Sequence, residues 1–144
     1  MKKFKDLTCI LLIDDDPATN FLNKLVIEDA AVDAYIKVTE GGQEALEYLT
    51  CSGRYSSETK YPQPGIILLD INMPGMNGWE FIEEYKKLPD DQKGKILLVM
   101  LTTSLNPDDR KRAGTIEDVE DFVSKPLSRE TLMKILETHY PEKN

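Results

Sequence analysis

The chain alternates short apolar runs with amphipathic segments from end to end, and this alternation limits the folds open to it. Three runs, at residues 9–13, 65–70 and 95–102, are almost continuously apolar, which is typical of parallel strands buried on both faces. Residues 34–38 and 118–125 are weaker strand candidates. The intervening segments have helical spacing, at residues 17–30, 41–51, 77–88, 106–117 and 128–140. This succession of strand–helix units predicts an α/β fold, a doubly wound parallel sheet with helices on both faces.

The helical segments also carry signals for their ends and for their buried sides. Asp16 precedes Pro17, which suits an N-cap followed by the first helical position. Ser128 is a natural N-cap for the last helix, and Leu127 and Leu132 have the spacing of a hydrophobic staple. In the segment 77–88 we expect one of Trp79 and Phe81 in the core and the other partly exposed. In the segment 17–30 we expect one apolar stripe to face the core, formed by Phe21, Leu22, Leu25 and Val26.

Length and composition favour one globular domain over residues 1–144, with its core at about residues 7–140. Residues 52–64 are polar, so we interpret them as an inserted surface loop, with a docking surface for a partner as the alternative. The net charge is −8 and the pI is about 4.7, which disfavours direct nucleic-acid binding. No apolar run approaches the length of a membrane span. We therefore expect a cytoplasmic protein.

Polar and reactive side chains stand where the predicted strands end. The first strong run ends in Asp14, Asp15 and Asp16, the second in Asp70, and the third in Thr102, with Thr103 and Ser104 behind it. The last candidate strand ends in Lys125. Because the carboxyl ends of parallel strands share one edge of a sheet, where ligands of open α/β sheets bind, we expect these groups to meet there.

Such a cluster of carboxylates needs a cation. Two carboxylates about 4 Å apart repel by about 4 kcal/mol at an effective dielectric of 20, and Lys125 supplies only one positive charge. Oxygen ligands favour Mg²⁺, Mn²⁺ or Ca²⁺ over zinc, and a site with few protein ligands suits Mg²⁺ together with a phosphoryl group. A carboxylate can attack phosphorus to form an acyl phosphate. The residues thus predict phosphoryl chemistry assisted by Mg²⁺, with Mn²⁺ as a possible substitute, and with Thr102 and Lys125 contacting the phosphoryl oxygens.

Four stretches of this sequence resemble the response-regulator receiver family, the CheY-like domain of two-component signalling. They are "ILLIDDD", "IILLDINMPGMNGWE", "LLVMLTTS" and "DFVSKPL", in the same order and spacing over nearly the whole chain. The resemblance implies a flavodoxin-like sheet of order 2-1-3-4-5 and a cis Lys125–Pro126 bond. It also implies a phosphohistidine donor on a sensor histidine kinase or a histidine phosphotransfer protein, and a switch that is not a turnover enzyme.

The resemblance also implies a role for each residue of the motifs. Asp70 is similar to the phosphoacceptor, and Thr102 and Lys125 to the switch hydroxyl and the phosphate-binding lysine. Phe122 stands at the aromatic switch position, where tyrosine is frequent. The metal ligands implied are Asp15 directly, Asp14 mainly through water, Asp70, and the backbone carbonyl of Asn72.

Three features depart from the family pattern or leave alternatives open. Thr103 is bulkier than the residue usual beside the switch threonine, and the apolar stripe of residues 106–117 is thin, so we expect a short exposed helix there. "DDD" also contains the D-x-D of haloacid dehalogenase-type phosphatases, whose nucleophile would be Asp14. A pseudo-receiver that only binds partners is a further alternative. The downstream target is not predicted, and dimerisation on phosphorylation is left open as a further alternative.

Overall fold

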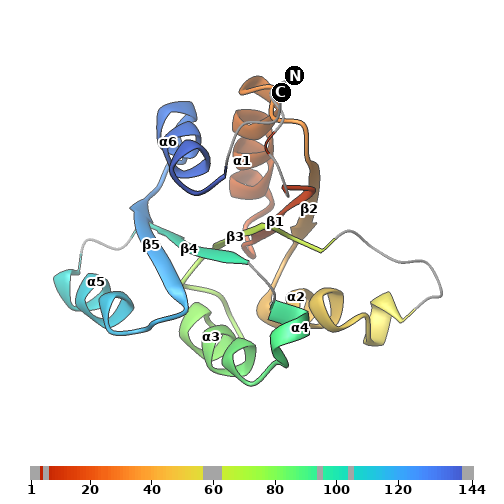
Figure 1. The fold of residues 1–144 in the computed structure, drawn as a ribbon. Helices are drawn as coiled ribbons and strands as arrows, with labels where there is room; N and C mark the ends of the chain where they lie inside the picture. The colour runs from red at the N-terminus through yellow and green to blue at the C-terminus, as the bar shows by residue number, and fades with distance from the viewer. Residues whose placement is uncertain (1–3, 5–6, 57–62, 94–95, 104–105, 141–144) are drawn as a thin grey trace.

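The computed structural model describes residues 4, 7–56, 63–93, 96–103 and 106–140. Their centre is a five-stranded parallel sheet of order β2-β1-β3-β4-β5 (Figure 1), as predicted. The strands are β1 Cys9–Ile13, β2 Tyr35–Thr39, β3 Ile66–Leu69, β4 Leu97–Thr102 and β5 Val119–Ser124. Every residue of β1, β3 and β4 is buried, which explains why these three runs are continuously apolar.

Helices cover both faces of this sheet (Figure 1). The helices α1 Pro17–Asp29 and α6 Arg129–His139 lie on one face, and α2 Gly42–Thr50, α3 Gly78–Lys86 and α5 Pro107–Gly114 lie on the other. A short helix, α4 Asp90–Lys93, precedes β4. Alternate residues of β1 serve the two resulting cores, Leu11 and Ile13 on the α2–α3 side and Ile10 and Leu12 on the α1–α6 side. Each such burial stabilises the fold by about 1.5–3 kcal/mol relative to exposure.

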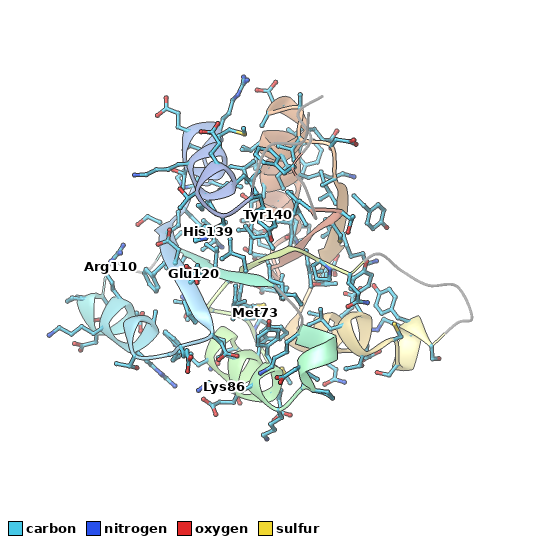
Figure 2. The ribbon with its side chains drawn as sticks, in the orientation of Figure 1. Met73, Lys86, Arg110, Glu120, His139 and Tyr140 are labelled. Carbon is cyan, nitrogen blue, oxygen red and sulfur yellow. The ribbon has the colours of Figure 1, made fainter. Side chains whose placement is uncertain are left out.

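The predicted helix starts are confirmed by their capping contacts. The Asp16 carboxylate accepts a hydrogen bond from the Ala18 N–H, and the Ser128 hydroxyl accepts one from the Thr131 N–H. The helix α5 is short and exposed as expected, with only Ala113 among its residues buried. At the other end of the chain's last helix, His139 lies beside Glu120 of β5, with 3.8 Å between Nε2 and Oε1 (Figure 2).

The predicted buried face of α1 is wrong for three of its four residues, while the fourth, Val26, is partly buried and packs against the core. Its buried residues are Asn20, Asn23 and Ile27, whereas Phe21 is 62% exposed, Leu22 56% and Leu25 45%. Residues 21, 22 and 25 lie roughly opposite residues 20, 23 and 27 at 3.6 residues per turn. The helix is therefore turned so that Asn20, Asn23 and Ile27 face the core, while the apolar side chains of Phe21, Leu22 and Leu25 face solvent.

The expectation for Trp79 and Phe81 is also wrong in part, because both side chains are buried. Phe81 lies in the core and stacks on Tyr85 with ring centroids 6.0 Å apart. Trp79 is shielded by a residue of another helix, since the guanidinium of Arg112 lies 4.3 Å from its ring centroid. The residue pattern of α3 alone could not predict that a residue of another helix shields Trp79.

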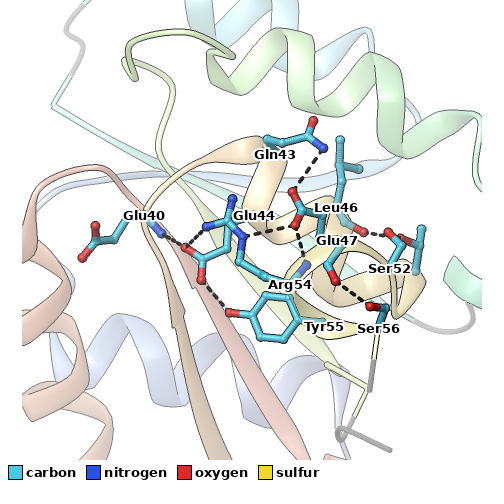
Figure 3. Close-up of polar contacts among 11 residues, drawn as sticks. Glu40, Gln43, Glu44, Leu46, Glu47, Ser52, Arg54, Tyr55 and Ser56 are labelled. Atoms are coloured by element: carbon cyan, nitrogen blue, oxygen red, sulfur yellow. Dashed lines mark hydrogen bonds and ion pairs between the residues drawn. The ribbon is translucent and has the colours of Figure 1, made fainter. Parts of the chain in front are cut away.

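The loop predicted over residues 52–64 begins with a short 3-10 helix, η1 Gly53–Tyr55, which is bound to α2 (Figure 3). The Glu47 carboxylate accepts hydrogen bonds from the backbone N–H and the Nε of Arg54, at 3.0 and 3.1 Å. The Tyr55 hydroxyl donates to Glu44, and the Tyr55 side chain is buried. The start of this segment is thus part of the fold, while residues 57–62 of the predicted loop lie outside the described residues.

Candidate functional site

The predicted meeting of strand-end groups at the carboxyl edge of the sheet is confirmed for Asp14, Asp15, Asp70 and Lys125. Asp14 follows β1, Asp70 follows β3, Thr102 ends β4 and Lys125 follows β5. Asp14, Asp70 and Thr102 are buried, while Asp15 is exposed. A strand order of β1-β3-β4-β5 brings these residues together although up to 111 positions separate them in the chain.

Lys125 joins two of the carboxylates. Its Nζ atom donates hydrogen bonds to Asp14 Oδ2 at 2.6 Å and to Asp70 Oδ1 at 3.0 Å. The Lys125 backbone N–H donates to the Thr102 carbonyl at 2.7 Å, which extends the β4–β5 pairing to this residue. The following Lys125–Pro126 bond is cis, as the resemblance implies. The lysine is thereby held at the centre of the site.

Burial and charge shift the acid–base equilibria of this cluster. Burial raises the pKa of Asp70, and the nearby charges of Asp14 and Asp15 raise it further, while Lys125 opposes the rise. For Lys125, burial favours the neutral amine, but the contacts with Asp14 and Asp70 outweigh it and raise the pKa. The lysine therefore stays charged, and Asp70 holds a proton more readily than an ordinary aspartate does.

Asp14 is bonded at each of its polar groups. Its N–H donates to the Thr39 carbonyl at 3.2 Å, and its carboxylate accepts the Asp16 N–H at 2.9 Å as well as Lys125. Its main-chain carbonyl accepts a hydrogen bond of 2.8 Å from Nδ2 of Asn20. This last contact could not be predicted from the pattern of residues, because an isolated polar residue within a helix carries no distinctive signal.

The third acid of "DDD" is separate from the cluster. The Asp16 carboxylate accepts hydrogen bonds from the Thr19 hydroxyl at 2.7 Å and the Ala18 N–H at 3.2 Å. These bonds lower the pKa of Asp16, and the bond from the Thr19 hydroxyl has the largest effect. Asp16 therefore acts as a helix cap, as its position before Pro17 predicts.

The remaining acids form a donor set that fits a divalent cation. One carboxylate oxygen from each of Asp14, Asp15 and Asp70 can be chosen so that all lie within 4.8 Å of one another. Hard oxygen donors and a net negative charge suit Mg²⁺ or Mn²⁺. Asn72 is exposed two residues after Asp70, and ligation by its carbonyl stays a prediction.

Gly78, the first residue of α3, has a specific role beside the site. Its N–H donates to the Ile71 carbonyl at 2.8 Å, and a Cβ atom at this position would lie 2.6 Å from the Asp70 carbonyl oxygen. The start of α3 can approach the backbone of Asp70 this closely only because residue 78 has no side chain. The glycine thus fixes the loop that carries Asp70.

The predicted switch residues lie between this site and α5. Thr102 is buried at the end of β4, and Phe122 is buried on β5. The Arg110 guanidinium of α5 lies 4.9 Å from the Phe122 ring centroid. Thr103 is exposed next to Thr102, and Ser104 lies outside the described residues.

Comparison with known proteins decides the family. The model of the response regulator receiver domain matches residues 10–137. This chain belongs to the response-regulator receiver family. Membership favours the receiver interpretation over the phosphatase alternative, and receiver domains act with histidine kinases in two-component systems.

Individual relatives agree with this assignment. Response regulator Rcp1 of Synechocystis is 36% identical over 100 residues, which cover 69% of this chain and 65% of that protein. The crystal structure of a two-component response regulator from Cytophaga hutchinsonii has a TM-score of 0.79 and 34% identity, covering 93% of this chain and 97% of that one. The Mn²⁺-bound form of Rcp1 has a TM-score of 0.71 and 30% identity, covering 91% and 90%. The sequence match covers only 65% of Rcp1. The expectation that residues 1–144 form one domain therefore stays a prediction.

Proposed function

We propose that the protein is a phosphorylation-dependent signalling switch whose phosphoacceptor is Asp70. The observation that carries the proposal is the position of Asp70, a strand-end carboxylate within reach of two further acids and hydrogen-bonded to a buried lysine. Asp14 is a poorer nucleophile, because both of its carboxylate oxygens already accept hydrogen bonds. Asp15 is exposed and serves as a metal ligand.

The reaction is a transfer of one phosphoryl group. An ionised Asp70 oxygen forms the new O–P bond as the N–P bond of a phosphohistidine breaks, and the imidazole leaves with the electron pair of that bond. Asp15, Asp70, the Asn72 carbonyl and, mainly through water, Asp14 would hold Mg²⁺, which would supply positive charge to neutralise the phosphoryl oxygens. The Lys125 ammonium exchanges its bond to Asp70 for a phosphoryl oxygen, and the Thr102 hydroxyl donates to another. Hydrolysis of the acyl phosphate resets the switch.

The exposed face of α1 is the proposed contact for the donor protein. Phe21, Leu22 and Leu25 lie on the helix that begins directly after the acid cluster, and Tyr35 is a further large exposed apolar residue. An apolar patch of this kind is typical of an interaction site. A sensor histidine kinase or a histidine phosphotransfer protein that covers it brings its phosphohistidine beside Asp70.

Phosphorylation then biases the face formed by β5, α5 and α6. Movement of Thr102 toward the phosphoryl group leaves space for the Phe122 ring to turn. This rotation changes the contact between Phe122 and Arg110, and with it the packing of α5 on β5. The protein assists its own phosphorylation and dephosphorylation and otherwise acts as a regulator.

Among the described residues, none of the helices has the length and apolar character needed to span a bilayer. We propose a cytoplasmic location, where the donor kinase domain would be.

Incubation with Mg²⁺ and acetyl phosphate, followed by intact-mass measurement, tests this function. The wild-type chain should gain the mass of one phosphoryl group, and Asp70→Asn should gain none. Modification that persists in Asp70→Asn and is lost in Asp14→Asn would instead favour the phosphatase alternative. A wild-type chain that binds Mg²⁺ but is never modified would favour a pseudo-receiver.

A further inference from the structure

Two asparagines occupy the buried face of α1. Asn20 is 3% exposed and Asn23 is 5% exposed. They lie on the same side of the helix as Ile27, which packs into the apolar core between α1, α6 and the sheet. Such a position ordinarily favours an apolar side chain, so each amide requires a reason.

The Asn20 amide is unfavourable for folding alone. Its Oδ1 atom is buried and, among the described residues, has no hydrogen-bond partner. A buried acceptor that is left unsatisfied costs free energy, whereas an apolar residue of the same shape avoids this cost. Leucine has a similar shape and a higher helix propensity. The reason for asparagine therefore lies with its other end, the Nδ2 group.

That Nδ2 group holds the carbonyl of Asp14 at 2.8 Å, in a buried hydrogen bond. The bond spans the junction between β1 and α1, where the chain must turn from strand to helix. On the other side of the same residue, the Asp14 N–H is held by the Thr39 carbonyl of β2. Together the two bonds fix the main chain of Asp14, and with it the direction in which the carboxylates of Asp14 and Asp15 point.

We propose that Asn20 is a positioning residue for the divalent-cation site, acting through the main chain of Asp14. This inference rests on the proposed function, because it assumes that the cluster of Asp14, Asp15 and Asp70 binds a metal. Asn20 does not touch the metal. Its amide restricts the acids to the arrangement that the cation needs, in the same way that outer-shell hydrogen bonds orient metal ligands elsewhere.

Titration with Mn²⁺, with free ion measured by electron paramagnetic resonance, tests the inference without phosphorylation. In Asn20→Leu the Mn²⁺ dissociation constant should rise by about tenfold, the lower end for loss of an outer-shell partner. The matched control is Asn23→Leu, a buried asparagine one turn away on the same face, which should bind Mn²⁺ like wild type. Urea unfolding without metal should give similar stabilities for the two variants. At saturating Mg²⁺, Asn20→Leu should be phosphorylated by acetyl phosphate at nearly the wild-type rate.

The possible failures are distinguishable. Wild-type affinity in Asn20→Leu, or an equal loss in Asn23→Leu, would overturn the positioning role and leave the metal site intact. A wild-type chain that binds no Mn²⁺ would overturn both the role and the proposed metal site. If Asn20→Leu does not fold, Asn20→Ala replaces it, with Asn23→Ala as control, and the same shift in Mn²⁺ affinity is expected.

Discussion

Lys125 donates a hydrogen bond of 3.0 Å to Asp70, which precedes it by 55 positions. The same ammonium contacts Asp14 at 2.6 Å, so one cation balances two buried acids across three strand ends. Removal of the Lys125 ammonium would leave the buried negative charge of these acids uncompensated.

Lys125→Met should therefore destabilise the metal-free protein by about 3 kcal/mol, the low end for a broken buried ion pair. Mg²⁺ should restore more stability to the variant than to wild type, because it replaces the missing positive charge. Urea unfolding with and without Mg²⁺ measures both effects. A variant as stable as wild type without metal would show that Lys125 does not balance the acids.

The raised pKa of Asp70 predicts a pH dependence of stability. The folded state binds a proton at Asp70 more tightly than the unfolded state, so this residue lowers the stability as pH rises from its ordinary pKa through its folded pKa. Asp70→Asn, measured without metal, should thus be stabilised relative to wild type near neutral pH. The difference should shrink as the pH falls through the folded pKa of Asp70. A difference that is constant with pH would contradict the assigned shift.

The same shift should appear in the reaction. Only the ionised carboxylate attacks phosphorus. As the pH is lowered at low Mg²⁺, the rate of phosphorylation should therefore begin to fall at a pH above the ordinary pKa of an aspartate. Saturating Mg²⁺ should move this fall to lower pH, because a bound cation favours the carboxylate. Rates measured with acetyl phosphate between mildly acidic and neutral pH, at two Mg²⁺ concentrations, provide the comparison. Identical profiles at both concentrations would argue against a cation beside Asp70.

The contact between Arg112 and Trp79 predicts that α5 is held partly by a cation–π interaction. Arg112→Ala should cost about 0.5–1 kcal/mol of stability and should change the emission of Trp79, the single tryptophan of the chain. Lys111→Ala, at the exposed neighbouring position of the same helix, is the control. Equal spectra for the two variants would mean that Arg112 does not shield the ring.

The exposed apolar face of α1 predicts a separation between two phosphoryl donors. Leu22→Asp and Leu25→Asp should reduce labelling by a phosphorylated histidine kinase or phosphotransfer protein that labels wild type, by about tenfold or more, the loss expected for a core residue of an interface. Labelling by acetyl phosphate should stay the same, since this small donor needs no docking surface. Lys111→Gln on α5, which also makes the net charge more negative by one unit, is the control for charge. Equal losses with both donors would indicate damage to the site instead.

The strand-end residues could be predicted because the information is local. Asp14, Asp70, Thr102 and Lys125 each follow an apolar run, and parallel strands bring their ends together whatever the details of packing. The orientation of α1 could not be predicted in this way. Its apolar stripe at Phe21, Leu22 and Leu25 satisfies the helical pattern, but the face that packs against the core carries Asn20, Asn23 and Ile27, and two of these three are polar.

The contacts of η1 and α5 were unpredictable for a similar reason. Tyr55 packs in the core and also donates its hydroxyl hydrogen bond to Glu44 of α2. Trp79 packs in the same core, and Arg112 of α5 lies over its ring. Both partners are charged residues that a sequence pattern assigns to solvent. Their positions follow from the packing of whole helices.

A crystal structure with Mg²⁺ and beryllofluoride, a stable analogue of the phosphoryl group, tests the central claim most directly. The beryllium should be bonded to a carboxylate oxygen of Asp70, with the Lys125 ammonium and the Thr102 hydroxyl on its fluorines and Mg²⁺ beside Asp14 and Asp15. An adduct on Asp14, or an Asp70 that stays bonded to Lys125 with no adduct at saturating beryllofluoride, would contradict it.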